Sequence, residues 1–182
     1  MMWVFGYGSL LWNPGFRARR TVLARLPAYH RSFCMRSVHH RGTPEDPGLV
    51  LALDAAGDTD CHGLALGVAP DDADEVLAYL RERELVSSAY VERNLLVDLA
   101  DGTQVEAVTY VVDPDHVQYC GGLPLEEQAR IIARAVGGRG PNTEYLHNTV
   151  AHLATLGIAD ADLDWLDHRV RALTTQARDR TG

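Results

Sequence analysis

The stretch FGYGSLLW, residues 5–12, is an apolar and aromatic run that enters a Gly-Tyr-Gly-Ser turn. It predicts a first strand ending in a glycine turn. The spacing does not make a dinucleotide-binding fingerprint, because Leu11 stands where the third glycine would be. It does not make a nucleophile elbow either, because Tyr7 and Leu11 flank Ser9 where glycines are needed. The turn is therefore either a plain strand end or a loop whose backbone N–H groups approach a ligand.

The rest of the chain reads as strands first and helices last. Apolar runs and turn residues predict a strand within 21–36 broken by Pro27, a hairpin of 48–57 with 61–68, and a hairpin of 89–99 with 104–113 turning at Asp101-Gly102. Periodicity and capping residues predict a helix within 69–84 that begins near Asp71 or Asp72, and further helices at 124–136, 141–157 and 160–177. This order predicts an α+β fold with an antiparallel or mixed sheet curling towards a barrel.

Composition sets the broad class. With 182 residues, 46% of them hydrophobic, the chain predicts a single domain over 1–182 with a frayed tail from about 177. The odd, widely spaced cysteines Cys34, Cys61 and Cys120 suit reduced thiols. Neither a leader nor an apolar span is evident, so we expect a cytoplasmic protein without a membrane partner. The net charge of −8 argues against nucleic acid.

The basic residues exclude several chemistries, because all 17 of them are arginine and the chain has no lysine. A Schiff-base lysine, a Walker lysine and a lysine general base each require a primary amine. The eight histidines show no metal-binding spacing: His39 and His40 are adjacent, and His147 and His152 are five apart. We therefore expect no metal site and no cofactor.

The segment YLRERELVSSAYVERN, residues 79–94, places Glu82 and Glu84 at the end of a predicted helix. These glutamates are either part of a solvated helix end or, if one of them is partly desolvated near the sheet, a general base. The sequence of this segment does not decide between a solvated helix end and a general base.

Five blocks together resemble the ChaC family of glutathione-specific gamma-glutamylcyclotransferases. They are FGYGSLLW, HHRGTPEDPGLVLAL, YLRERELVSSAY, YCGGLPLEEQA and GPNTEYL, in the family's order, and the resemblance runs from Trp3 to about Leu153. It implies a gamma-glutamylcyclotransferase-like fold, a small mixed β-barrel with flanking helices. It also implies an enzyme that splits glutathione into 5-oxoproline and cysteinylglycine.

The resemblance also implies site residues. The glutamate that acts as base falls on Glu84, with Glu82 as a second candidate. Many members have one or two glycines between that glutamate and the next tyrosine, whereas residues 85–89 stand here. The implied substrate contacts are Gly6, Tyr7, Gly8, Ser9, Leu10 and Tyr145. Apart from the resemblance, Arg41 in the HHRG segment is either a partner for a glutathione carboxylate or a solvated arginine.

The reaction needs a base because the substrate's α-amine attacks its own γ-amide carbonyl. With reference pKa values of ~8 for the amine and ~4.3 for Glu, the proton transfer is uphill by about 3.7 units, roughly 5 kcal/mol. Burial that raises the carboxyl pKa narrows this gap. Two alternatives stay open: a cyclotransferase for other gamma-glutamyl amines or dipeptides, and a non-catalytic gamma-glutamyl-binding regulator associated with transport. The oligomeric state is not predicted.

Overall fold

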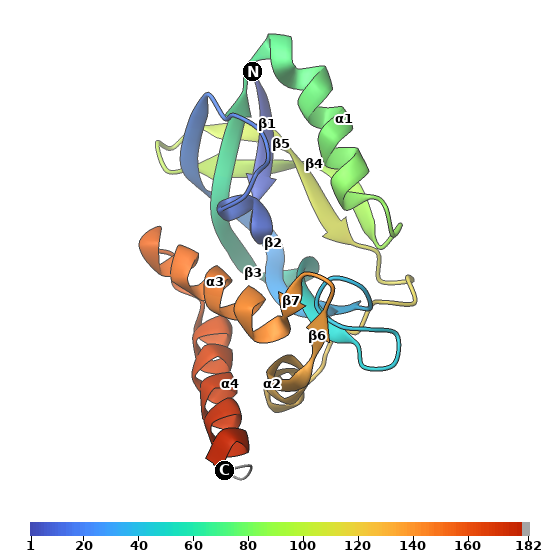
Figure 1. The fold of residues 1–182 in the computed structure, drawn as a ribbon. Helices are drawn as coiled ribbons and strands as arrows, with labels where there is room; N and C mark the ends of the chain where they lie inside the picture. Colours follow the sequence, from blue (N-terminus) through green and yellow to red (C-terminus); the bar gives the residue numbers. More distant parts are fainter. Residues whose placement is uncertain (180–182) are drawn as a thin grey trace. The chain divides into compact units, whose positions relative to one another are not determined.

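A five-stranded closed barrel is the central element of the computed structural model, which describes residues 1–179. The barrel order is β1-β3-β2-β4-β5 (Figure 1). Its strands are β1 (Met2–Gly6), β2 (Arg20–Ser37), β3 (Gly48–Val68), β4 (Tyr90–Leu99) and β5 (Gln104–Val112). The α+β class and the curling sheet predicted from the sequence are confirmed.

Strand β1 makes the barrel mixed. It pairs antiparallel with β3, from Met2 opposite Val68 to Gly6 opposite Leu64. On its other side it pairs parallel with β5, where Trp3 lies opposite Ala107. Strand β4 pairs antiparallel with both β2 and β5. The parallel pairing of β1 with β5 therefore closes the sheet on itself.

The barrel interior is an apolar core built from alternate positions of the strands. Phe5, Leu26, Leu53 and Val97 are at most 1% exposed. Their burial fixes the register of each strand, since a slip by one residue would turn these side chains outward.

Two sequence predictions about the strands are wrong. The predicted hairpin of 48–57 with 61–68 is one continuous strand, β3. The small and polar residues in its middle are mostly exposed, as in a strand that bends around a barrel, and such residues mimic a turn signal. Strand β2 likewise runs through Pro27, and the left-handed φ of 63° at Ala28 absorbs the bend.

Helix α1 (Ala73–Glu84) follows the short helix η2 (Pro70–Asp72) and lies beside the barrel strands (Figure 1). Its start matches the predicted one near Asp71 or Asp72, because Asp74 and Glu75 favour the positive end of the helix dipole. The 89–113 hairpin is also confirmed, and its turn residue Gly102 has a φ of +85°.

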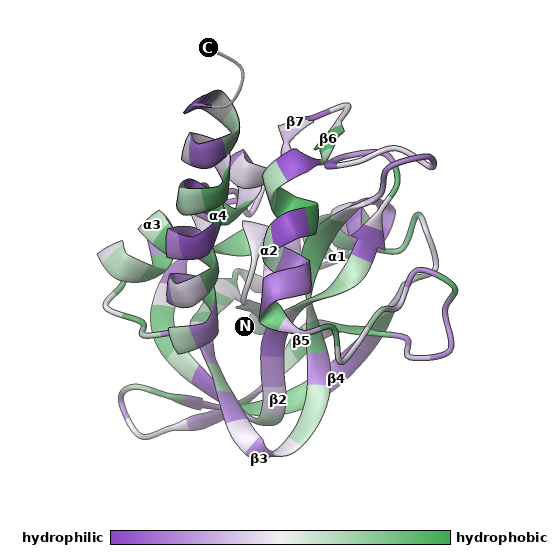
Figure 2. Cartoon of the chain, turned by 90° about the horizontal axis from the view of Figure 1, so that it is seen from below, coloured by the Kyte–Doolittle hydropathy of each residue, from purple (hydrophilic) through white to green (hydrophobic). Residues whose placement is uncertain are grey.

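The later helices are those predicted, with shifted ends. They are α2 (Leu125–Arg134), α3 (Asn142–Thr155) and α4 (Ala161–Asp179), and a two-stranded hairpin of β6 (Val136–Gly137) and β7 (Gly140–Pro141) separates α2 from α3. Figure 2 shows hydrophobic and hydrophilic residues alternating along α2 and α4, as in helices with one buried side. The frayed tail predicted from about residue 177 is helical to Asp179, and the remainder of it lies outside the described residues.

The chain forms two compact units. One contains residues 1–32 and 52–119, and the other contains 33–51 and the described chain from Cys120 onward. The single domain expected from length stays a prediction. Among the described helices, none combines the length and the apolar character that crossing a bilayer requires.

Candidate active site

The glycine turn follows directly from β1 in the first unit. Gly6 still belongs to the strand, and the one-turn helix η1 spans Ser9–Leu11. A Cβ atom on Gly6 would lie 3.2 Å from the Cβ of Leu10, so glycine permits the chain to fold back closely. The turn is closed by the N–H of Leu11, which donates to the carbonyl of Gly8 at 2.9 Å.

Two arginines hold this turn from opposite ends. Arg31, buried in β2, donates to the carbonyl of Tyr7 at 2.7 Å and to that of His62 at 2.9 Å. Arg83, near the end of α1, donates to the hydroxyl of Ser9 at 2.9 Å. All three hydrogen bonds come from ionised donors, which makes them stronger than neutral ones. Arg31 therefore fixes the backbone of the turn at Tyr7, and Arg83 fixes the side chain of Ser9.

The side chains of Tyr7 and Leu10 belong to the core. Tyr7 is 7% exposed and its hydroxyl donates to the carbonyl of Tyr110 at 2.9 Å, while Leu10 is 6% exposed. These residues can therefore contribute to a ligand site chiefly through their backbone groups.

Glu84 is the last residue of α1 and is mostly buried. Its side chain is 18% exposed, and its Oε1 lies 3.2 Å from the Nε of Arg83. Burial raises the pKa of the Glu84 carboxyl, and the charge of Arg83 opposes the rise in part. The negative end of the α1 dipole also disfavours the carboxylate at this position. The result is a carboxyl that holds a proton more readily than a solvated glutamate does.

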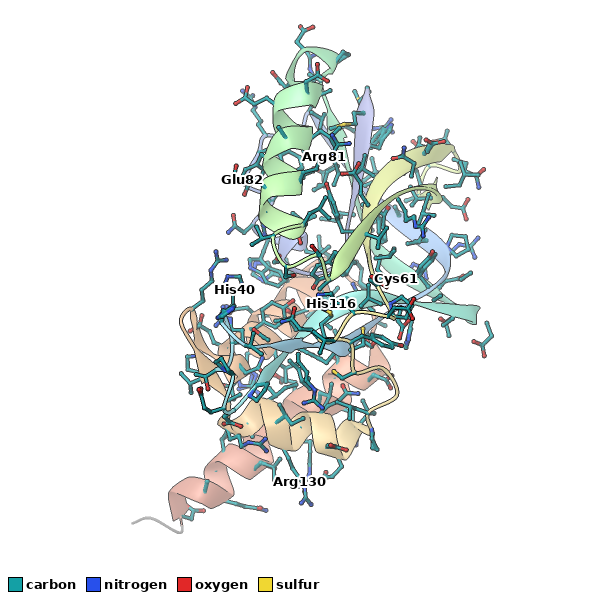
Figure 3. The ribbon with its side chains drawn as sticks, turned by 90° about the vertical axis from the view of Figure 1, so that its right-hand side faces the viewer. His40, Cys61, Arg81, Glu82, His116 and Arg130 are labelled. Carbon is teal, nitrogen blue, oxygen red and sulfur yellow. The ribbon has the colours of Figure 1, made fainter. Side chains whose placement is uncertain are left out.

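Glu82 has a different setting. Its side chain is more open to solvent, and Figure 3 shows it on the side of α1 that faces away from the strands. One helix therefore presents one glutamate to solvent and one to a partly dry environment.

A second polar network lies beside Glu84 on the barrel. Arg81 donates twice to the carboxylate of Glu92, at 2.7 and 2.8 Å, and the hydroxyl of Tyr110 donates to Glu92 at 3.1 Å. Hydrogen bonds from Arg81 lower the pKa of Glu92, which stays ionised. Burial, followed by the charges of Glu92 and Glu84, raises the pKa of Tyr110 above its ordinary range. The Tyr110 hydroxyl therefore stays protonated, donates to Glu92 and lies close enough to Glu84 to be affected by its charge.

Residues 85–89 form a tight turn between α1 and β4. Ser88 adopts a left-handed φ of 56°, and its N–H donates to the carbonyl of Leu85 at 3.2 Å. Ala89 is fully buried, whereas Val86 is 80% exposed. Ser88 thus takes the backbone conformation that glycine adopts most easily.

The raised pKa of Glu84 predicts a pH-dependent gain in stability for Glu84→Gln. A carboxyl whose pKa is higher in the folded than in the unfolded state destabilises the fold once it ionises. We expect the variant to be more stable than the parent at pH 8, and the difference to vanish near pH 4, below the unfolded pKa. Urea unfolding at both pH values measures it, with Glu82→Gln as the control for losing one charge. An equal gain at pH 4 and pH 8 would contradict the prediction.

Arg41 and Tyr145 meet in the second unit. The guanidinium carbon of Arg41 lies 5.7 Å from the centre of the Tyr145 ring. Arg41 also donates to the carbonyl of Pro141 at 3.1 Å and to Glu144 at 3.4 Å, and its side chain is 14% exposed. The hydroxyl of Tyr145 accepts a long hydrogen bond of 3.4 Å from the N–H of Leu51. Arg41 is thus held against an aromatic ring, with one weakly bound carboxylate beside it.

Close backbone contacts fix the segment that carries Arg41. A Cβ atom on Gly137 would lie 2.4 Å from the nitrogen of Gly42 and 2.5 Å from that of Arg41. The N–H groups of Gly138 and Arg139 donate to the carbonyls of His39 and His40, at 2.7 and 2.9 Å. Burial, together with the neighbouring positive charges, lowers the pKa of His40.

The structure therefore brings the sequence-predicted residues together in two groups. The turn residues and Glu84 form one group, joined by Arg83, and Arg41 with Tyr145 forms the other. The groups belong to different compact units. Sequence reasoning missed the arginines Arg31 and Arg83. The only local signal for Arg83 is its position next to Glu84, and Arg31 has none.

Comparison with known proteins places the chain. A family model described as ChaC-like protein matches residues 2–173. A glutathione-specific gamma-glutamylcyclotransferase of Escherichia coli (strain K12) is 34% identical over 175 residues, which cover 96% of this chain and 75% of that protein. Gamma-glutamylcyclotransferase 2-3 of Arabidopsis thaliana is 34% identical over 187 residues, 98% of this chain and 92% of that one.

A solved structure agrees. The crystal structure of a gamma-glutamyl cyclotransferase specific to glutathione from yeast superposes with a TM-score of 0.84 at 25% identity, covering 94% of this chain and 96% of that chain. The gamma-glutamylcyclotransferase-like barrel implied by the sequence resemblance is thereby confirmed. On the family match and these relatives, the chain belongs to the ChaC-like protein family.

Proposed function

We propose that this chain is a gamma-glutamylcyclotransferase that cleaves glutathione to 5-oxoproline and cysteinylglycine, with Glu84 as general base and then general acid. Its family and the activities named for its relatives support the reaction. The observation that carries the assignment of Glu84 is its burial: it is a carboxyl with a raised pKa, tied through Arg83 to the glycine turn.

The turn is the proposed holder of the gamma-glutamyl group. The first N–H groups of a helical turn have no carbonyl partner within it, and η1 begins at Ser9. The amides of Gly8, Ser9 and Leu10 are the proposed donors to the substrate's α-carboxylate or to the oxyanion that forms at the γ-carbonyl. Because Arg31 binds the Tyr7 carbonyl and Arg83 binds the Ser9 hydroxyl, little reorganisation of the turn is needed on binding.

The chemistry is ring closure within one molecule. The α-nitrogen forms a bond to the γ-carbonyl carbon, and the bond from that carbon to the cysteine nitrogen breaks. The α-ammonium starts with three hydrogens and the lactam nitrogen keeps one, so two protons pass to the departing nitrogen, which leaves as an ammonium. One carboxyl near both nitrogens can carry each proton in turn. A pKa raised towards that of an amine makes removal of the ammonium proton less uphill, and the carboxylic acid is still acidic enough to protonate the more basic departing nitrogen.

Arg41 and Tyr145 remain proposed substrate contacts. Arg41 is held in place, and the Glu144 carboxylate beside it is 54% exposed and 3.4 Å away, so a substrate carboxylate is a competitive partner for this guanidinium. A cytoplasmic location is proposed from the cysteine pattern, which suits a reducing compartment.

Burial of Glu84 also weighs against a non-catalytic regulator. A sensor gains nothing from a desolvated carboxyl beside its ligand, because that carboxyl lowers stability once ionised. A solvated Glu84 with an ordinary pKa would have favoured the sensor.

A direct incubation tests the function. We expect the protein to release 5-oxoproline from glutathione, measured by chromatography, without added metal or cofactor. The same assay with gamma-glutamyl-alanine measures the substrate preference, for which we expect a lower kcat/KM. Release from gamma-glutamyl-alanine alone would move the activity to other gamma-glutamyl compounds. Binding of glutathione without release from either substrate would favour the regulator.

A further inference from the structure

Arg83 makes contacts beyond its ion pair with Glu84, the proposed general base. Its guanidinium contacts three parts of the first unit. Nη2 donates to the Ser9 hydroxyl at 2.9 Å, Nη1 donates to the carbonyl of Asn13 at 2.7 Å, and Nε lies 3.2 Å from the Glu84 carboxylate. Nη1 also contacts the hydroxyl of Tyr79 at 3.2 Å. The side chain is 21% exposed, so it is held rather than solvated.

These contacts have different consequences for the neighbouring groups. The bonds to Ser9, the first residue of η1, and to Asn13, which follows the C-cap of η1, fix the guanidinium relative to the turn. The remaining edge of the guanidinium then faces Glu84. Because a guanidinium is planar and rigid, the position of Ser9 determines where the Glu84 carboxylate finds its ion-pair partner.

We propose that Arg83 is a positioning residue of the reaction, which aligns the carboxylate of Glu84 with the glycine turn and supports its ionised form while the site awaits substrate. This inference rests on the proposed function and deepens it. The proton step needs the base within hydrogen-bond reach of the reacting nitrogen, and a displacement of about 1 Å can cost roughly 100-fold in rate.

The charge of Arg83 also opposes the effect of burial on Glu84. Burial raises the pKa of Glu84 and Arg83 lowers it. The other titratable or charged groups of this region are Arg31 on β2, Tyr110 on β5, the Arg81–Glu92 pair between α1 and β4, Tyr79 on α1 and Tyr7 before η1. Among these, Arg83 is the cation in direct contact with Glu84, so its removal should raise the pKa of Glu84 further.

The test compares Arg83→Gln with Arg83→Lys across about pH 5–9. For Arg83→Gln we expect kcat for glutathione to fall roughly 10- to 100-fold and the acid limb of the kcat/KM profile to move to higher pH. Arg83→Lys keeps the charge but cannot span Ser9 and Glu84 together, so the limb should stay in place while kcat remains reduced. Arg130→Gln is the control, because Arg130 is exposed on α2 and pairs with Glu126.

A second variant and a direct measurement of the Glu84 pKa complete the test. Ser9→Ala removes the hydrogen bond from Arg83 to Ser9 and keeps the ion pair of Arg83 with Glu84. It should therefore lower kcat without moving the acid limb of the kcat/KM profile. This variant tests the proposal if Arg83→Gln does not fold. Carbon-13 NMR titration of the Glu84 carboxyl, assigned with Glu84→Gln, should show a higher pKa in Arg83→Gln whether or not glutathione is cleaved. If no substrate is cleaved but the pKa moves, the proposed function fails and the coupling of Arg83 to Glu84 stands. An unmoved pKa and limb, with kcat within about twofold of the parent, overturns the proposal.

Discussion

Glu84→Gln is expected to reduce the release of 5-oxoproline from glutathione by about 10²- to 10⁴-fold, the usual contribution of a general acid–base group. The amide cannot take the ammonium proton or return it to the departing nitrogen. Binding should change little, because the turn that is proposed to hold the gamma-glutamyl group makes its contacts through backbone groups and Ser9. Single-turnover assays measure the rate, and calorimetry with glutathione measures the affinity.

Glu82→Gln is the matched control, since it changes the same residue type on the same helix at a position more open to solvent. It should retain the parent's rate. Circular dichroism and thermal melting of both variants check that the fold is intact. Activity of Glu84→Gln within about tenfold of the parent would reject Glu84 as the base, and a selective loss in Glu82→Gln would transfer the role to that residue.

Local signals predicted much of the fold. The hairpin of β4 and β5 is visible because Asp101-Gly102 supplies a turn residue with positive φ between alternating strands. The start of α1 is visible because Pro70 and acidic residues favour a helix start. The continuity of β3 is not, because residues around Gly57 have turn-like composition and only the barrel requires them to be extended.

In the candidate site, too, some features follow from local sequence signals and others depend on how the chain folds. Family resemblance and spacing point to Glu84, but its burial depends on how α1 packs, which no local pattern specifies. The hydrogen bond from Arg83 to Ser9 joins residues 74 positions apart, and that from Arg31 to Tyr7 joins residues 24 apart. Isolated arginines in a chain with 17 of them carry no signal of such contacts. The sequence therefore predicts a candidate base, whereas the contacts that hold Glu84 and the glycine turn are found only in the folded chain.

Gly42→Ala is expected to lower the free energy of unfolding by roughly 3 kcal/mol and Tm by about 6–12 °C. A Cβ atom at this position would lie 2.0 Å from the nitrogen of Gly48 and 2.5 Å from the carbonyl oxygen of Ser37. Both are backbone atoms, so no side-chain rotation relieves the overlap. The chain must separate at this point, and separation also displaces Arg41, the residue before Gly42. Urea unfolding measures the loss.

Gly57→Ala is the matched control for this prediction. Gly57 lies in β3, where an added methyl group would meet no atom within 4 Å, and it has no positive φ, so its replacement should change stability by no more than about 0.5 kcal/mol. Equal stability of the two alanine variants would mean that the segments around Gly42 and Gly48 do not approach as closely as described.

The same variant also tests the proposed role of Arg41. If Arg41 binds a substrate carboxylate, Gly42→Ala should raise KM for glutathione more than it lowers kcat, because the displaced guanidinium takes no part in the proposed proton transfer. Steady-state assays well below the Tm of the variant measure both constants. A fall in kcat at unchanged KM would remove Arg41 from the proposed substrate contacts.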